Sequence, residues 1–154
     1  MKAKTKALVF NIALPLITGA VSAYISREGM MGFKNLAQPP LSPPAVLFPI
    51  VWTILYILMG IAAYLVQVSG DRNSDSALTL YYVQLGFNFL WSVFFFKFGL
   101  YYFALLWLVI LWVLIAMTMK AFSKISKMSA YLLAPYIIWV SFAAYLNLGT
   151  AILN

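Results

Sequence analysis

The chain contains no cysteine and no histidine, and it has only three acidic residues against ten lysines and arginines in 154 positions. Without cysteine no disulfide can form. Histidine and cysteine are also the usual ligands of zinc and of haem iron, and the usual bases or nucleophiles of hydrolase triads. The composition therefore excludes these classes of site, and we expect neither a metal site nor a cofactor.

Charge of either sign is scarce as well. Only 8% of the residues are charged and 65% are hydrophobic, whereas soluble domains carry about 25% charged residues. A bilayer-spanning helix needs about 20 mostly apolar residues. We predict an all-α integral membrane protein with one domain over 1–154. The charge-free runs place its five helices at about 7–26, 45–68, 77–96, 100–121 and 129–152.

The first apolar run could instead be a cleaved signal peptide, because three lysines precede it and VSA at 21–23 resembles a cleavage site. Its 20 residues are longer than a usual signal core, so we expect a retained helix.

Basic residues predict the orientation. With five spans, the N-terminus and the 69–76 and 120–128 loops lie on one side and hold seven of the ten lysines and arginines. The positive-inside rule places the N-terminus inside and the C-terminus outside. The net charge of +7 then reflects topology and attraction to membrane lipids, with no nucleic-acid partner expected. Short loops without a basic C-terminal tail favour a bacterial cytoplasmic membrane.

Ion-coupled transport usually requires an ionisable group within the bilayer. The acids all fall in predicted loops, and Lys97 lies at a tight turn, where a lysine usually extends to the interface. A pocket in this protein must therefore be built from aromatic, aliphatic and amide groups.

Tryptophans lie several residues inside the predicted helices, where an interfacial belt explains them less well. Some share a helix face with neighbours at helical spacing: Trp52 with Tyr56, and Trp139 with Ala143 and Leu146. Phe103, Leu106 and Ile110 form a third stripe, whereas Trp107 and Trp112 are interpreted as packing or lipid-facing residues. Ordinary helix packing also produces such stripes. Asn88, within one turn of Trp91, bonds either across helices or to a ligand.

Three blocks resemble the TspO/MBR family, the tryptophan-rich sensory proteins whose animal members are called translocator protein or peripheral benzodiazepine receptor. They are QPPLSPPAVLFPIVWTILYILMG at 38–60, QLGFNFLWSVFFF at 84–96 and LLAPYIIWVSFAAYLN at 132–147. The resemblance implies a five-helix bundle, often dimeric, with a cavity under the loop between the first two spans.

Members of this family bind porphyrins, and several bind sterols or synthetic hydrophobic ligands. The resemblance thus implies a membrane receptor or binding protein for protoporphyrin-type tetrapyrroles, acting in sensing, transport or disposal, with a hydrophobic small molecule, lipids and a second copy as partners. With the spacing argument, it predicts that the ligand-binding residues are Ala23, Leu47, Phe48, Trp52, Tyr56, Asn88, Trp91, Phe103, Trp139, Ala143 and Leu146.

A porphyrin is a flat apolar disc with two carboxylates, so Arg27 or Lys34 would pair with its propionates at the water edge. The missing axial ligands favour metal-free protoporphyrin. One alternative is an enzyme that degrades porphyrin with light and oxygen through Trp52 and Trp139, as some bacterial members are reported to do. A second alternative is a sterol-binding, lipid-binding or structural subunit.

The chain departs from the family pattern in the first loop. Gly32-Phe33 and Leu41 stand where relatives commonly have a Trp-Tyr pair and a tryptophan, which reduces the indole content of the lid. The sterol motif of animal members of this family has a basic residue after a tyrosine in the last helix. No basic residue follows Tyr145 here, so specific sterol binding is disfavoured.

Five prolines precede or begin the second span. Four of them, at 39, 40, 43 and 44, are expected to keep the loop extended as a stiff lid. Pro49 is expected in the first turns of the helix, where it sets the direction of Trp52.

Overall fold

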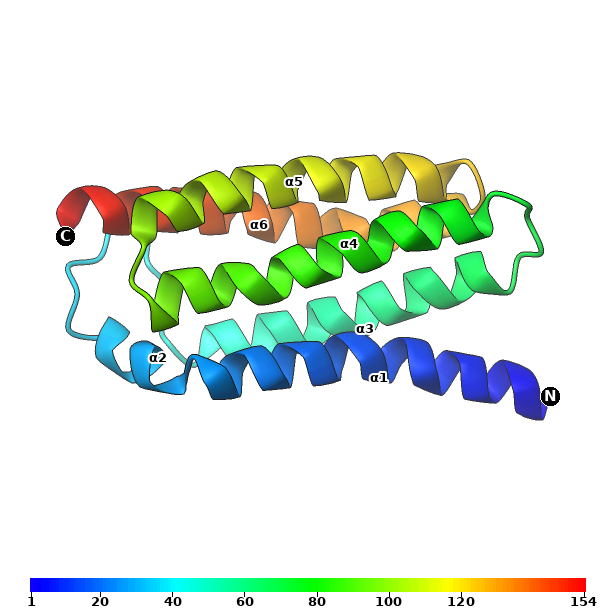
Figure 1. Cartoon of the computed structure of the whole chain (residues 1–154), viewed down its shortest axis with the longest axis horizontal. Coiled ribbons are helices and arrows are strands. Elements are labelled where there is room, and N and C mark those ends of the chain that lie inside the picture. The colour runs from blue at the N-terminus through cyan, green and yellow to red at the C-terminus, as the bar shows by residue number, and fades with distance from the viewer.

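The computed structural model describes all residues 1–154, and all of its regular secondary structure is helical (Figure 1). Its segments are α1 (Lys2–Ile25), α2 (Arg27–Phe33), α3 (Leu47–Gln67), α4 (Ser74–Ser92), the π-helix η1 (Val93–Lys97), α5 (Tyr101–Ser123) and α6 (Lys127–Leu153). Five are long and apolar enough to cross a membrane, with α4 and η1 forming one of them. The predicted five-span bundle is confirmed.

The five spans run side by side and close into a ring in which α1 packs on α3, α3 on α6, α6 on α5, α5 on α4, and α4 on α1. Close approach requires small residues. A side chain at Gly60 of α3 would overlap the backbone of Asn11 on α1. The buried core within the ring includes Met59, Leu108, Leu111 and Tyr136.

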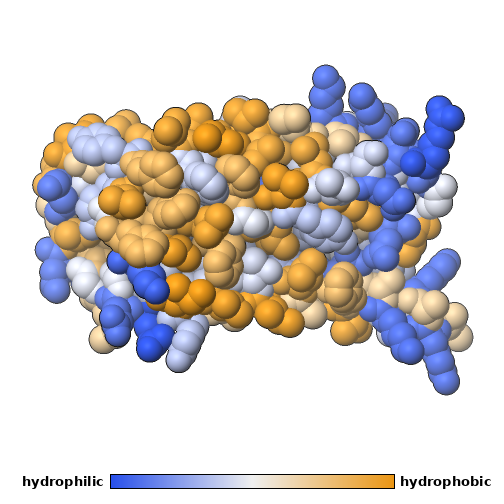
Figure 2. Space-filling view, viewed as in Figure 1, coloured by the Kyte–Doolittle hydropathy of each residue, from blue (hydrophilic) through white to orange (hydrophobic).

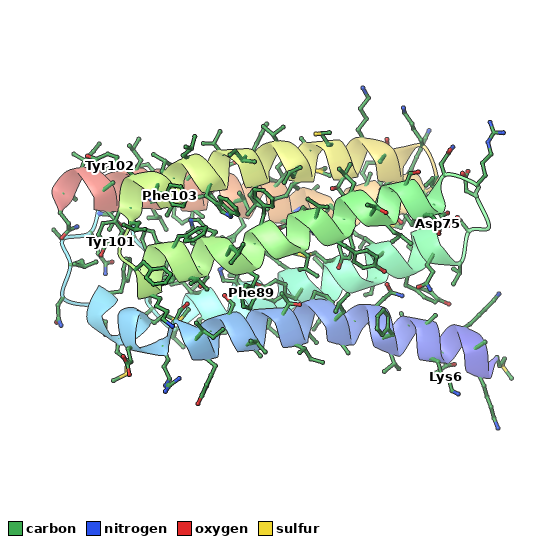
Figure 3. All side chains as sticks on the ribbon, viewed as in Figure 1. Lys6, Asp75, Phe89, Tyr101, Tyr102 and Phe103 are labelled. Carbon is green, nitrogen blue, oxygen red and sulfur yellow. The ribbon has the colours of Figure 1, made fainter.

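The polar ends of the bundle are separated by a broad apolar belt, as the space-filling view shows (Figure 2). Lys6 and Asp75 lie at the end that holds the N-terminus, whereas Tyr101 lies at the opposite end, near the C-terminus (Figure 3). This arrangement suits a multi-pass membrane protein, because hydrocarbon contacts the belt and water contacts both ends.

The 27–44 segment is not wholly a loop, as the sequence prediction had it, because residues 27–33 form the short helix α2. Gly29 allows this helix to dock: a side chain there would overlap the carbonyl group of Phe96 in η1. Seven residues are too few for a clear periodic pattern. The tertiary contact with η1 therefore stabilises a helix that the local sequence does not predict.

The proline-rich segment is only partly extended. It turns at residues 40–41, where Leu41 has a positive φ of 69°. Pro49 is the third residue of α3, in the first turn as predicted, and its carbonyl accepts a hydrogen bond from the Thr53 hydroxyl at 2.7 Å.

The end of α6 holds the first half of this segment in place. Asn154 accepts a hydrogen bond from the Ala37 amide at 3.1 Å and donates one to the Ala37 carbonyl at 2.8 Å. The Tyr145 hydroxyl donates to the Pro40 carbonyl at 2.6 Å. Gly149 leaves room for the Pro39 ring, which a side chain at that position would overlap. We call residues 34–46 the lid and these α6 contacts the clasp.

Candidate functional site

A cavity of about 630 Å³ lies beneath the lid. Its wall is built by α1, α2, α3, α4, η1 and α6, and Gln38, Pro43 and Ala45 of the lid contribute to it. Cavities that bind small molecules typically measure about 300–1,000 Å³ and have mostly apolar walls with a few polar groups. This cavity has both the size and the composition of such a site.

Most of the predicted ligand-binding residues line this one cavity. They are Ala23, Phe48, Trp52, Tyr56, Asn88, Trp91, Trp139, Ala143 and Leu146. Lys34, predicted as a propionate partner, also lines it. Residues from four helices and the lid thus converge on one space. Their role in binding remains a prediction.

Two of the predicted ligand-binding residues, Leu47 and Phe103, do not line the cavity. Leu47 begins α3 and is 37% exposed, and Phe103 lies on the outer side of α5 with 45% of its surface exposed. Phe103 instead packs its ring edge-on against Phe94. The third stripe therefore faces outward, because helical spacing shows that residues share a face without showing which face is buried.

Arg27 is also outside the cavity. Its guanidinium lies 4.2 Å from the centroid of the Tyr24 ring and donates a hydrogen bond to the Tyr24 carbonyl at 2.9 Å. Lys34 is the only charged residue among those that line the cavity. Of the two candidate propionate partners, Lys34 lines the cavity and Arg27 does not.

Several lining residues were missed by the sequence argument. They are Leu16, Gly19, Ala20, Ser22, Met30, Phe33, Gln38, Pro43, Ala45, Pro49, Thr53, Ser92, Phe95, Phe96 and Asn147. Helical spacing from Asn88 would have found Ser92 and Phe95. Met30 and Phe33 carry no such signal, because α2 was not predicted.

Trp52 stands at the centre of the aromatic wall. Its ring stacks on Tyr56 with centroids 5.5 Å apart and an interplanar angle of 26°. The centroid of Trp91 lies 6.4 Å away and that of Tyr136 lies 6.3 Å away, edge-on. Such offset and edge-to-face pairs are the preferred geometries of aromatic rings. The wall therefore presents flat apolar surfaces held by mutual packing.

The other two cavity tryptophans differ in their hydrogen bonding. The Trp91 indole donates to Asn147 Oδ1 at 3.1 Å, and Asn147 Nδ2 donates to the Tyr101 carbonyl at 2.8 Å. Trp139 packs edge-on against Phe48, and its Nε1 is buried without a partner. An unpaired buried donor costs about 1–3 kcal/mol. Trp91 is thus anchored, whereas Trp139 retains an unused donor.

The inner end of the cavity is polar. The Tyr56 hydroxyl donates to Asn88 Oδ1 at 2.9 Å, and Asn88 Nδ2 donates to the Tyr136 hydroxyl at 2.8 Å. Asn88 is only 3% exposed. The alternatives that the sequence left open for Asn88 are therefore not exclusive, since this residue bonds across helices and also lines the cavity.

The two tryptophans interpreted as packing residues lie outside the site. Trp107 stacks on Phe87 with centroids 4.2 Å apart and donates to the Phe87 carbonyl. Trp112 is exposed on the outer surface and donates to the Ser141 hydroxyl at 2.9 Å. Leu41, the lid residue that the family resemblance places where a tryptophan is common, is 82% exposed and does not line the cavity.

The chain is similar to known proteins over nearly its whole length. A sequence model of the TspO/MBR family matches residues 11–153. The tryptophan-rich protein TspO of Chlorobaculum tepidum is 38% identical over 150 residues, which cover 96% of this chain and 95% of that protein.

Two further relatives carry other names of the same family. The tryptophan-rich sensory protein of Cereibacter sphaeroides is 38% identical over 122 residues, covering 79% of this chain and 76% of its own. The translocator protein of Homo sapiens is 32% identical over 144 residues, covering 92% of this chain and 85% of its own. The five-span bundle, the lidded aromatic cavity and these matches agree: the chain belongs to the TspO/MBR family of membrane proteins.

Proposed function

We propose that this protein is a membrane receptor or binding protein that takes a protoporphyrin-type tetrapyrrole into the lidded cavity. Family membership supports the membrane receptor or binding role. The observation that carries the choice of ligand is the cavity itself, which combines flat aromatic walls with a single lining cation, Lys34. Stacking accommodates an apolar disc, and an ammonium group pairs with a carboxylate.

The residues of the chain favour a metal-free ring. Neutral imidazole and thiolate, the usual axial ligands of haem iron, are both absent from the sequence. Affinity in this site must come from stacking and burial against Trp52, Trp139 and their neighbours. The physiological role that follows is sensing, transport or disposal of the pigment.

Titration of the purified protein with protoporphyrin IX tests this proposal through quenching of tryptophan fluorescence. We expect saturable quenching in the native chain. Ala143→Phe should abolish it, because Ala143 lines the cavity and a phenyl ring would fill space beside the indole of Trp139. Ile138→Phe is the matched control on the exposed face of the same helix. The proposal fails if quenching does not saturate or if Ala143→Phe quenches like the native chain.

A second candidate function is light- and oxygen-dependent degradation of the bound porphyrin. The close packing of Trp52 with Trp91 and Tyr136 favours it, since Trp52 and Trp91 are oxidisable rings that line the cavity and Tyr136 packs against Trp52. The excited pigment and oxygen would supply the chemistry, and the protein would supply the geometry.

Illumination of the protein with protoporphyrin IX in air separates the two functions. Trp52→Phe and Trp139→Phe should slow bleaching or change its products if the indoles react. Trp112→Phe, on the outer surface, should not. Equal bleaching rates and products in all variants would show that these indoles do not react, and binding without degradation would remain as the function.

We also propose a bacterial cytoplasmic membrane with the N-terminus inside, and a homodimer. Because the chain has no cysteine, a single cysteine placed at either end can be labelled with a membrane-impermeant maleimide in intact cells. Labelling from outside should occur only at the C-terminus. Native mass spectrometry of the purified protein should show two copies, and a monomer alone would contradict the dimer.

A further inference from the structure

Three hydrogen bonds, of which the last two are buried, lead away from the cavity in one direction. The first two join Tyr56 to Asn88 and Asn88 to Tyr136, and in the third the Tyr136 hydroxyl donates to Gln84 Oε1 at 2.7 Å. Tyr56 and Asn88 line the cavity, whereas Tyr136 and Gln84 do not. We call these four residues the relay. Each residue of the relay donates a hydrogen bond to the next residue farther from the cavity, and Gln84 is the last acceptor.

This direction determines what Tyr56 offers to a ligand. A phenolic hydroxyl has one proton to donate and lone pairs that accept. Since the proton of Tyr56 is used on Asn88, its oxygen can only accept a hydrogen bond from a bound molecule. The ring has little freedom to turn away, because it stacks on Trp52 and lies against Gly19, where a side chain would overlap it.

Gln84 ends the relay and supplies its last acceptor. This residue is 1% exposed, and its Nε2 has no partner. If the acceptor at position 84 is removed, the Tyr136 proton must find Asn88 Oδ1, which requires the Asn88 amide to turn over. The amide N–H of Asn88 would then donate to the Tyr56 oxygen, and the Tyr56 hydroxyl would be free to donate a hydrogen bond to a molecule in the cavity.

We propose that Gln84 is a positioning residue that determines ligand specificity from outside the cavity. By holding the relay in its observed direction, it makes Tyr56 an acceptor, so the site selects ligands that bring an O–H or N–H group to Tyr56. This inference rests on the proposed function of the cavity as a binding site, but it does not require the ligand to be a porphyrin.

A matched pair of flat aromatic probes tests the relay. 1-Hydroxypyrene carries a hydrogen-bond donor, whereas pyrene-1-carbaldehyde carries only an acceptor. The measured quantity is the ratio of their dissociation constants, taken by fluorescence titration in one detergent and compared with the ratio in Tyr56→Phe. That variant removes the hydroxyl and sets the baseline for partitioning.

We expect the native chain to favour the hydroxyl probe by about fivefold relative to this baseline, which is the effect of one net hydrogen bond. Gln84→Leu should abolish or reverse the preference without touching the cavity wall. Gln84→Met, which keeps a flexible side chain and lacks a strong acceptor, should do the same if the leucine variant folds poorly. Tyr81→Phe is the control, because Tyr81 lies one turn from Gln84 and its hydroxyl has no partner; its ratio should remain native.

The inference is overturned if the native chain favours the aldehyde, if the Gln84 variants keep the native ratio, or if Tyr81→Phe shifts the ratio as much as they do. Failure of both probes to bind the native chain would refute the cavity as a binding site altogether. Normal probe ratios without protoporphyrin binding would refute only the porphyrin proposal.

Discussion

The hydrogen bonds of the clasp between α6 and the lid should determine how often the lid opens. Asn154 exchanges two hydrogen bonds with Ala37, at 3.1 Å and 2.8 Å, and its side chain donates a third to the Thr150 carbonyl at the end of α6. Replacing Asn154 with alanine removes both bonds to the lid. A net hydrogen bond contributes about 0.5–1.5 kcal/mol, and this pair is exposed to water, so we take about 1–2 kcal/mol for both.

A loss of that size raises the population of the open lid about 5–30-fold. Hydrogen exchange at the Ala37 amide, which donates to Asn154, should accelerate by the same factor in Asn154→Ala. Release of protoporphyrin IX, measured by stopped-flow displacement, should accelerate as well. Tyr145→Phe removes a single bond to the lid and should produce a smaller change.

The control for this series is Tyr131→Phe, an exposed tyrosine of α6 whose hydroxyl is outside the clasp. It should leave exchange unchanged. If Asn154→Ala changes the exchange of Ala37 by less than twofold, the clasp does not hold the lid and the reasoning from its hydrogen bonds is wrong.

Two other predictions concern α2 and the mouth of the cavity. Gly29→Ala should lower the melting temperature, because the new methyl group would overlap the backbone of Phe96. The control Gly32→Ala should be neutral or slightly stabilising, since nothing lies within 4 Å of its added methyl group. Equal melting temperatures of the two variants would argue against docking of α2 on η1. Lys34→Ala should weaken protoporphyrin IX binding a few-fold at low salt and less at high salt, because an exposed ion pair is weak and screened. Arg27→Ala should not change binding, since that guanidinium is occupied with Tyr24 outside the cavity; a larger loss with Arg27→Ala than with Lys34→Ala would reverse this assignment.

The spans could be predicted because they depend on composition alone. A run of about 20 apolar residues in a bilayer must form a helix, since unpaired backbone groups are too costly in hydrocarbon. Their ends were less predictable. The first span begins at Lys2 and not near residue 7, because a basic segment continues a helix into water without cost to the core.

The cavity residues could be predicted in part, and the errors have a common cause. Trp52 and Trp139 share helix faces with their predicted neighbours, and those faces line the cavity. The stripe that contains Phe103 has the same spacing but faces outward. In a membrane the outer face is as apolar as the inner one, so periodicity in hydrophobicity cannot separate them.

The sequence by itself determined that this is a membrane protein, how many spans it has, which family it resembles and that it lacks thiol and imidazole chemistry. Each of these follows from which residues are present and how far apart they lie. Tertiary structure alone decided which aromatic faces meet around the cavity, that Lys34 lines it while Arg27 does not, and that Asn154 holds the lid. The relay from Tyr56 to Gln84 also depends on it, since hydrogen-bond direction is set by atoms from three helices that approach only when the ring of spans closes.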